Sequence, residues 1–266
     1  MSENSSLNMI LSILSNKQDV YPDTVKSIVD GSITEYYNKD LTLILNVFQY
    51  CKSLTEVNLP ACTSVGSNAF DNCTSLTEVN FPVCSYIGRS AFYSCKSLTK
   101  ANFPVCTSIE YRAFDNCTSL TEANFPVCTY IDDYAFDNCI SLTEANFPVC
   151  TNIGSGAFDR CSSLTEANFP VCTNIGSTAF YRCSSLTTFI LGASSTVSLP
   201  YSTTFDYTPM SDSSYTGTFG SIYVPASLVD SYKTANNWSY YADRITSIED
   251  HPEVYNTQNT EAGGES

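Results

Sequence analysis

Apolar side chains recur along the central part of the chain with a period of 22 residues. In the copy that runs from residue 120 to 141, Leu120, Ala123 and Phe125 are expected to point inward from a short strand. Pro126 would end this strand because it has no N–H to donate. The rest of the interior would be filled by Val127, Cys128, Ile131, Ala135, Phe136 and Cys139. No coil could bury nine apolar positions in 22 alone, so the period predicts a solenoid of coils that cover one another.

Cysteine is the most regularly spaced residue type in the chain. All thirteen cysteines belong to two series of period 22, at 51, 73, 95, 117, 139, 161 and 183 and at 62, 84, 106, 128, 150 and 172. A disulfide framework is disfavoured, because the number is odd and an in-phase ladder has no unique pairing. A metal site would need tight clusters such as CxxC, and the sequence has none. We therefore expect buried free thiols, which behave as small hydrophobic side chains, and no metal.

The repeat resembles a known family in both of its halves. Residues 120–131 read Leu-x-x-Ala-x-Phe-x-x-Cys-x-x-Ile, which matches the leucine-rich-repeat pattern LxxLxLxx(N/C)xxL. The other half, GxxAFxxC, is similar to the BspA-type subclass, which occurs on bacterial surface proteins and in phage-encoded proteins. The resemblance covers roughly residues 30 to 250. It implies an α/β-type repeat solenoid: a right-handed leucine-rich-repeat superhelix of about seven 22-residue coils, with a parallel β-sheet, a short helical N-terminal cap and a strand/helix C-terminal cap.

The regular pattern ends on both sides of the array, which divides the chain into four parts. Residues 1–32 contain two short apolar runs at helical spacing and are expected to form an N-terminal helical cap. Residues 33–183 are the leucine-rich-repeat array, residues 184–250 an imperfect coil and cap, and residues 251–266 a disordered tail. The apolar stripe of residues 5–16 would either cover the first coil or allow self-association with another chain.

Composition and charge narrow the choice of partners. The 266-residue chain carries 12 basic and 27 acidic residues, a net charge of −15, so most of its surface would repel nucleic acid. It has no apolar run long enough to insert into a membrane. The first residues lack a basic region and a cleavage site, so we expect no secretion signal in the sequence as given. Its location stays open, and the family resemblance favours a cell surface or a virion.

The sequence offers little for catalysis. Its one histidine, His251, lies in the polar tail, so neither a Ser-His-Asp nor a Cys-His arrangement is available within the array. No glycine-rich phosphate loop is present. The pair Asp132 and Asp133 is explained by a solvated turn. We therefore expect no enzyme activity and no cofactor.

One candidate binding surface is the outward face of the strands, where two polar ladders run from coil to coil. The members are Glu56, Glu78, Glu122, Glu144 and Glu166, interrupted by Lys100, and Asn58, Asn80, Asn102, Asn124, Asn146 and Asn168. Glutamates opposed on adjacent strands destabilise each other by a fraction of a kcal/mol. In one interpretation the ladders bind a cation or a basic partner. In the other they have no ligand: they are a solvent-exposed face copied by repeat duplication, whose asparagines hydrogen-bond to one another.

The second candidate surface consists of the positions that differ from repeat to repeat, in contrast to the repeat positions that stay the same. The residues there are almost all Tyr, Ser, Asn, Asp, Gly and Arg, the set used in antibody paratopes. The candidates are Tyr86, Arg89, Tyr93, Tyr111, Arg112, Tyr130, Asp132, Asp133, Tyr134, Arg160, Tyr181 and Arg182. Turn positions accept small polar residues in any case, but that explains Ser, Asn, Asp and Gly better than it explains tyrosine.

Together these patterns favour a non-catalytic binding or adhesion protein. Its ligand would be a protein or a glycan on a cell or host surface, recognised through the variable positions. The alternative is a structural spacer or assembly subunit, for example of a virion or a surface appendage, with no specific ligand. Tyrosines at variable positions distinguish the two, because a spacer gains nothing from them.

Overall fold

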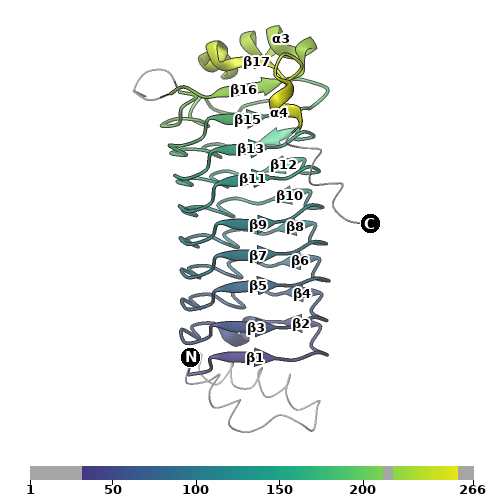
Figure 1. Ribbon diagram of the computed structural model, residues 1–266, viewed down its shortest axis with the longest axis vertical. Coiled ribbons are helices and arrows are strands. Elements are labelled where there is room, and N and C mark those ends of the chain that lie inside the picture. The colour runs from purple at the N-terminus through teal and green to yellow at the C-terminus, as the bar shows by residue number, and fades with distance from the viewer. Residues whose placement is uncertain (1–31, 212–217, 257–266) are drawn as a thin grey trace.

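The protein is a column of stacked coils (Figure 1). The computed structural model describes residues 32–211 and 218–256. Within them the chain makes about nine turns with a spacing of about 22 residues, which confirms the predicted parallel-strand solenoid. The number of turns is larger than the predicted seven because the coils at both ends have diverged from the repeat sequence but still form its strands. The predicted N-terminal cap and the stripe of residues 5–16 lie outside the described residues.

The first face of the column carries one short parallel strand from each coil. These strands are β1 (Glu35–Tyr37), β3 (Glu56–Asn58), β5 (Glu78–Asn80), β7 (Lys100–Asn102), β9 (Glu122–Asn124), β11 (Glu144–Asn146), β13 (Glu166–Asn168), β15 (Thr188–Ile190), β16 (Ser221–Val224) and β17 (Ile245–Ser247). They pair in register, so that Ala101 lies opposite Ala123. The pairing forms three groups: β1-β3, β5-β7-β9 and β11-β13-β15-β16-β17.

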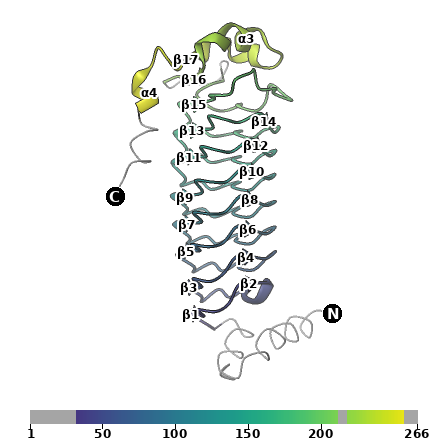
Figure 2. The same ribbon diagram turned by 90° about the vertical axis from the view of Figure 1, so that its right-hand side faces the viewer.

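A second face, which the sequence did not predict, carries strands of only two residues (Figure 2). They are β2 (Leu43–Ile44), β4 (Ser64–Val65), β6 (Tyr86–Ile87), β8 (Ser108–Ile109), β10 (Tyr130–Ile131), β12 (Asn152–Ile153) and β14 (Asn174–Ile175). All seven form one parallel sheet. Two residues are too few to show the alternation that marks a strand in a sequence. Tyr86 and Tyr130 therefore lie on a sheet and not in a turn.

The third face, here called the turn side, returns the chain to the next coil without regular strands. Backbone hydrogen bonds still join the coils there, for example from Phe114 N to Ala135 O (2.8 Å) and from Asn116 N to Asp137 O (2.8 Å). At two positions in each regular coil the backbone has a positive φ. The turn side is thus hydrogen-bonded from coil to coil as the sheets are, through a less common backbone conformation.

The interior is a stack of identical side chains. Phe136 stacks on Phe114 and on Phe158, each with ring centroids 5.3 Å apart, and similar contacts run the length of the array. Leu120 and Phe125 are buried as predicted. Val127 is not: its side chain lies on an outer corner and is 40% exposed, like the valines that follow the prolines of neighbouring coils. The interior prediction was wrong there because the preceding proline turns the chain outward.

The cysteines are packed inside the column as free thiols, as predicted. All thirteen are buried, and none of them forms a disulfide. Those of one series lie against a carbonyl of the preceding coil, as Cys139 Sγ does against Phe114 O (3.2 Å). Burial raises the pKa of Cys106 to about 12, which keeps the thiol protonated and unreactive. Among the residues that the structure describes, no group of His, Cys, Asp and Glu is arranged to hold a metal ion.

The described C-terminal part closes the last coil with strands and short helices. The helical elements within the described residues are η1 (Asn46–Phe48), η2 (Ala226–Leu228), α3 (Val229–Thr234), η3 (Trp238–Arg244) and α4 (Pro252–Asn256). Trp238 is buried and donates from Nε1 to Val197 O (2.6 Å), and Tyr241 packs edge-on against Phe205. We propose that residues 184–250 act as the C-terminal cap; α4 lies beyond them, in the segment predicted to be a tail. No described helix is long and apolar enough to cross a bilayer.

Candidate binding surface

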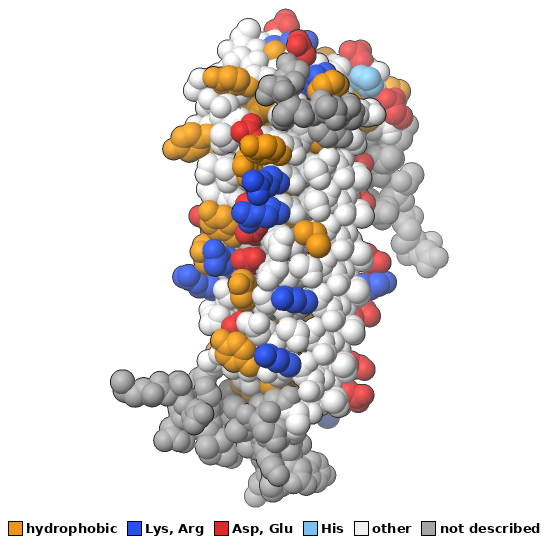
Figure 3. Space-filling view, turned by 90° about the vertical axis from the view of Figure 1, so that its left-hand side faces the viewer, with side chains coloured by type: hydrophobic (Ala, Val, Ile, Leu, Met, Phe, Trp, Pro, Cys, Tyr) orange, Lys and Arg blue, Asp and Glu red, His pale blue; other side chains and the backbone are white. Residues whose placement is uncertain are grey.

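The structure separates the variable positions between two faces. Tyr86 and Tyr130 point outward from the second sheet and are about 40% exposed. The other variable residues lie on the turn side or at its border with that sheet. Figure 3 shows hydrophobic, basic and acidic side chains gathered there in a column along the molecule, while the acidic ladder of the first face lies at the edge of the view.

Four of the predicted residues meet on the turn side and form what we call the lower cluster: Arg89, Tyr111, Arg112 and Tyr134. The Arg89 guanidinium lies 4.4 Å from the centroid of the Tyr111 ring. Arg112 lies 5.2 Å from the same ring and 5.5 Å from that of Tyr134. A cation over an aromatic face contributes about 0.5–1 kcal/mol at an exposed site, so these contacts hold the side chains in place.

Three residues near the C-terminal end form the upper cluster: Tyr181, Arg182 and Tyr207. The two rings meet edge to face with centroids 5.3 Å apart, and Arg182 lies 5.2 Å from one and 5.6 Å from the other. Beside them is a shallow pocket of about 430 Å³. Its lining is Ile140, Arg160, Ser162, Arg182, Ser184 and Tyr207.

Tyr207 was missed by the sequence reasoning because it lies beyond the last regular cysteine. A signal was present: Phe205-Asp206-Tyr207 repeats the order of Phe158-Asp159-Arg160 after an insertion. Ile140, Ser162 and Ser184 were missed because they follow a cysteine, at a position that was not counted among the variable ones. The pocket therefore joins predicted and unpredicted residues.

The remaining candidates are not part of either cluster. Tyr130 donates to Asp132 Oδ1 (3.2 Å), and burial together with this carboxylate raises the pKa of Tyr130. Asp133 accepts a bond from the Ser155 backbone N–H (2.6 Å), so it also fixes the next coil. Tyr93 is half-buried and occupies a slot that holds aspartate in most coils. Asp132 and Asp133 thus accept hydrogen bonds within their own coil and from the next one.

Many variable residues occupy backbone positions that favour glycine, asparagine and aspartate. Residues with φ between +52° and +61° precede the repeat's alanine and form the pre-alanine column: Asn68, Ser90, Arg112, Tyr134, Gly156 and Thr178. Residues with φ between +56° and +64° form the pre-cysteine column: Tyr50, Asn72, Ser94, Asn116, Asn138, Arg160, Arg182 and, in the imperfect coil, Tyr207. A left-handed residue other than Gly, Asn or Asp costs about 1–2 kcal/mol. Arg, Tyr and Thr in these columns therefore reduce the stability of the solenoid.

The backbone cost can be measured at Thr178, whose β-branched side chain is the least suited to its φ of +54°. Thr178→Asn is expected to raise the free energy of unfolding by about 1 kcal/mol, measured by urea denaturation. Thr118→Asn, at a half-buried site whose φ is not positive, is the control and should change stability by less than about 0.5 kcal/mol. Equal effects at both sites would contradict the assigned strain.

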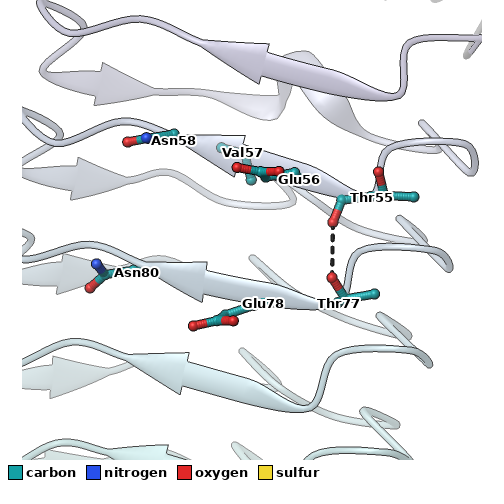
Figure 4. A pocket seen from close by; sticks show the side chains of 7 residues that line it. All are labelled: Thr55, Glu56, Val57, Asn58, Thr77, Glu78 and Asn80. Carbon is teal, nitrogen blue, oxygen red and sulfur yellow. Dashed lines mark hydrogen bonds between the residues drawn. The ribbon is translucent and has the colours of Figure 1, made fainter.

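The first face offers the alternative surface. Its glutamates are mostly exposed, and Lys100 pairs with Glu122 (Nζ to Oε2, 3.2 Å). Three asparagine pairs hydrogen-bond from coil to coil, for example Asn124 Nδ2 to Asn102 Oδ1 (2.6 Å). The carboxylates of Glu56 and Glu78 border a pocket of about 450 Å³ where β3 and β5 are not paired (Figure 4). This face is a hydrogen-bonded, acidic surface with little variation from coil to coil.

Comparison with known families identifies the repeats. Residues 42–149 and 85–211 match the BspA type leucine rich repeat region, in 6 copies. The chain belongs to the BspA-type leucine-rich-repeat family, as its repeat pattern predicts. Leucine-rich-repeat proteins are typically non-catalytic, and a surface-type family of this kind indicates a binding or adhesion role.

Similar solved structures come from bacterial leucine-rich-repeat proteins. A leucine rich repeat protein of T. pallidum is 26% identical with a TM-score of 0.45, over 58% of this chain and 72% of that one. A leucine-rich repeat protein from Bacteroides ovatus is 21% identical with a TM-score of 0.39, over 66% and 60%. A leucine rich cell surface protein from Faecalibacterium prausnitzii is 25% identical with a TM-score of 0.39, over 63% and 45%. No curated protein matches the chain in sequence.

Proposed function

We propose that this chain is a non-catalytic recognition protein that binds a protein or glycan on a cell or host surface through the variable residues of its turn side and second sheet. The observation that carries the proposal is the lower cluster, in which Arg112 and Tyr134 occupy left-handed positions at a cost in stability. Strained residues persist where function requires them. Tyrosine and arginine are also the residue types that dominate binding energies in protein interfaces.

A structural spacer remains the second candidate, and the continuous second sheet favours it. Seven strands from β2 to β14 join the coils without interruption, so the array can hold its two ends apart as a rod. A rod, however, is equally well served by asparagine in the left-handed columns. The spacer role therefore accounts for the core and the sheets but leaves the tyrosines and arginines of the turn side without a purpose.

The proposal is tested with a variant in which Tyr86, Tyr93, Tyr111, Tyr130, Tyr134 and Tyr181 are all serine. Binding of labelled protein to intact cells and to a glycan array is expected to fall at least tenfold, because each lost aromatic anchor removes about 1–2 kcal/mol. A control with Tyr37, Tyr201 and Tyr240 changed to serine removes exposed rings elsewhere and should bind normally. If both folded variants bind equally well, the tyrosines are not the binding residues and the first face is the better candidate. If the parent protein binds nothing, the spacer role is favoured.

A further inference from the structure

The pre-cysteine column changes character towards the C-terminal end of the array. In its lower part asparagine predominates: Asn138 Nδ2 donates to Asn116 Oδ1 (2.8 Å), and Asn116 Nδ2 donates to Ser94 Oγ (3.0 Å). In the last three coils the column holds Arg160, Arg182 and Tyr207, with φ of 60°, 60° and 59°. Asparagine would suit all three positions better. The chain thus sets two guanidinium groups and one aromatic ring side by side where its backbone favours a small amide.

The two arginines of this stretch differ in their counter-ions. Arg160 Nη1 lies 3.3 Å from Asp137 Oδ1 and 3.4 Å from Asp159 Oδ2, so its charge is balanced. In the next coil the aspartate position is taken by Tyr181. Among the described residues, Arg182 forms no ion pair with a carboxylate and instead lies beside the rings of Tyr181 and Tyr207. No carboxylate of the described residues therefore contacts Arg182, although its charge acts on nearby Asp159 and opposes the rise in the pKa of that carboxyl.

The pocket of about 430 Å³ beside Arg182 supplies the other contacts that an anionic ligand would need. The exposed ring of Tyr207 and the side chain of Ile140 offer apolar surface on its wall. Ser162 and Ser184 place hydroxyl groups at its border; each donates only a long bond to a backbone carbonyl, at 3.5 and 3.3 Å, and keeps its lone pairs as acceptors. Guanidinium, aromatic ring and hydroxyls thus converge on a space large enough for one sugar ring.

We propose that this upper pocket binds the carboxylate of an acidic saccharide, such as a terminal sialic acid or a uronic acid, on the guanidinium of Arg182. A guanidinium pairs with a carboxylate through two parallel N–H···O bonds. The sugar's C–H face would lie on Tyr207, and its hydroxyls would meet Ser162 and Ser184. A saccharide fits better than a peptide because the shallow pocket offers no unpaired strand edge for a main chain. This inference rests on the proposed recognition function and names the ligand class for one of its two clusters.

The test is isothermal titration calorimetry of the full chain at low salt. The probes are 3′-sialyllactose and glucuronic acid, with lactose as the neutral control and acetyl-triglycine as a peptide carboxylate. At least one acidic sugar is expected to bind with a dissociation constant of roughly 1 mM or below, and lactose is not. Arg182→Asn should weaken this binding about tenfold or more, because it removes a charged hydrogen-bonding pair, while the left-handed backbone accepts asparagine readily.

A matched control is Lys96→Asn, which removes an exposed cation that follows Cys95 as Ser184 follows Cys183, lies outside both clusters, and should leave acidic-sugar binding within twofold of the parent. The inference is overturned if neither acidic sugar binds, if acetyl-triglycine binds as well as the sugars, or if Arg182→Asn binds like the parent. Failure here is separable from failure of the proposed function. If no acidic sugar binds but the six-tyrosine variant still loses cell binding, only the ligand class is wrong.

Discussion

Replacing Phe136 with alanine is expected to lower the free energy of unfolding by about 3–5 kcal/mol. Its ring is fully buried and stacks on Phe114 and Phe158, and it also packs against Phe125 and Phe147 at 6.0 Å. The substitution therefore opens a cavity that weakens the interfaces with both neighbouring coils. In a solenoid, stability is close to a sum over coils and their interfaces, so the loss is not shared with distant parts. Urea denaturation followed by circular dichroism measures it.

The matched control is Val127→Ala in the same repeat. Val127 is 40% exposed on the outer corner, so its loss should cost less than about 1 kcal/mol. A cost comparable to that of Phe136→Ala would contradict the outward placement of this valine and restore the interior position that the repeat pattern predicts. A cost below about 1.5 kcal/mol at Phe136 would show instead that the phenylalanine stack is not a tightly packed core.

The core could be predicted from the sequence because its residues are copied from coil to coil. Burial needs the same side chain at the same phase in every copy, so Leu120 and Cys128 stand out by repetition alone. Val127 repeats as faithfully and yet lies outside. Repetition shows that a position has the same environment in every coil, but it does not show whether that environment is buried. The path of the backbone, here the turn at Pro126, decides whether the side chain faces inward.

The candidate surface could be predicted only in part. Tyr111, Arg112 and Tyr134 were predicted as candidates because their positions vary between repeats, and in the structure their side chains are in contact. The two-residue strands and the left-handed columns left no signal that a periodicity argument detects, since each involves one or two residues per coil. Asparagine before the cysteine was the one hint of a positive φ. Without the backbone conformation, the cost of placing arginine or tyrosine there cannot be inferred.

Beneath the turn side, three aspartates of adjacent coils form an acid stack: Asp115, Asp137 and Asp159. All three are buried at the position before the pre-cysteine column. Burial first, and then the neighbouring Asp137, raises the pKa of Asp115 to about 7 and that of Asp159 to about 6. Burial also raises the pKa of Asp137, against the opposing effect of Arg160. The arginines thus balance the stack only in part.

The acid stack is expected to make the folded protein less stable at pH 8 than at pH 5, by about 2–4 kcal/mol. Each folded-state pKa lies above the ordinary value of 3.8, so the folded state binds more protons than the unfolded state between about pH 4 and 7. The stabilisation is complete below the unfolded-state pKa and is lost as pH rises through the folded-state values. Urea denaturation at a series of pH values measures the slope.

The decisive variant is Asp137→Asn, which replaces the middle carboxylate by a neutral amide while Arg160 keeps Asp159 as a partner. It should raise stability at pH 8 and flatten the dependence on pH, because removing one charge also relieves Asp115 and Asp159. Asp243→Asn makes the same change of charge in η3, outside the stack, and should keep the parent's slope. A parent whose stability rises from pH 5 to pH 8, or an unchanged slope in Asp137→Asn, would show that the arginines neutralise the stack fully. In that case the acids would anchor the arginines of the turn side at no cost in stability.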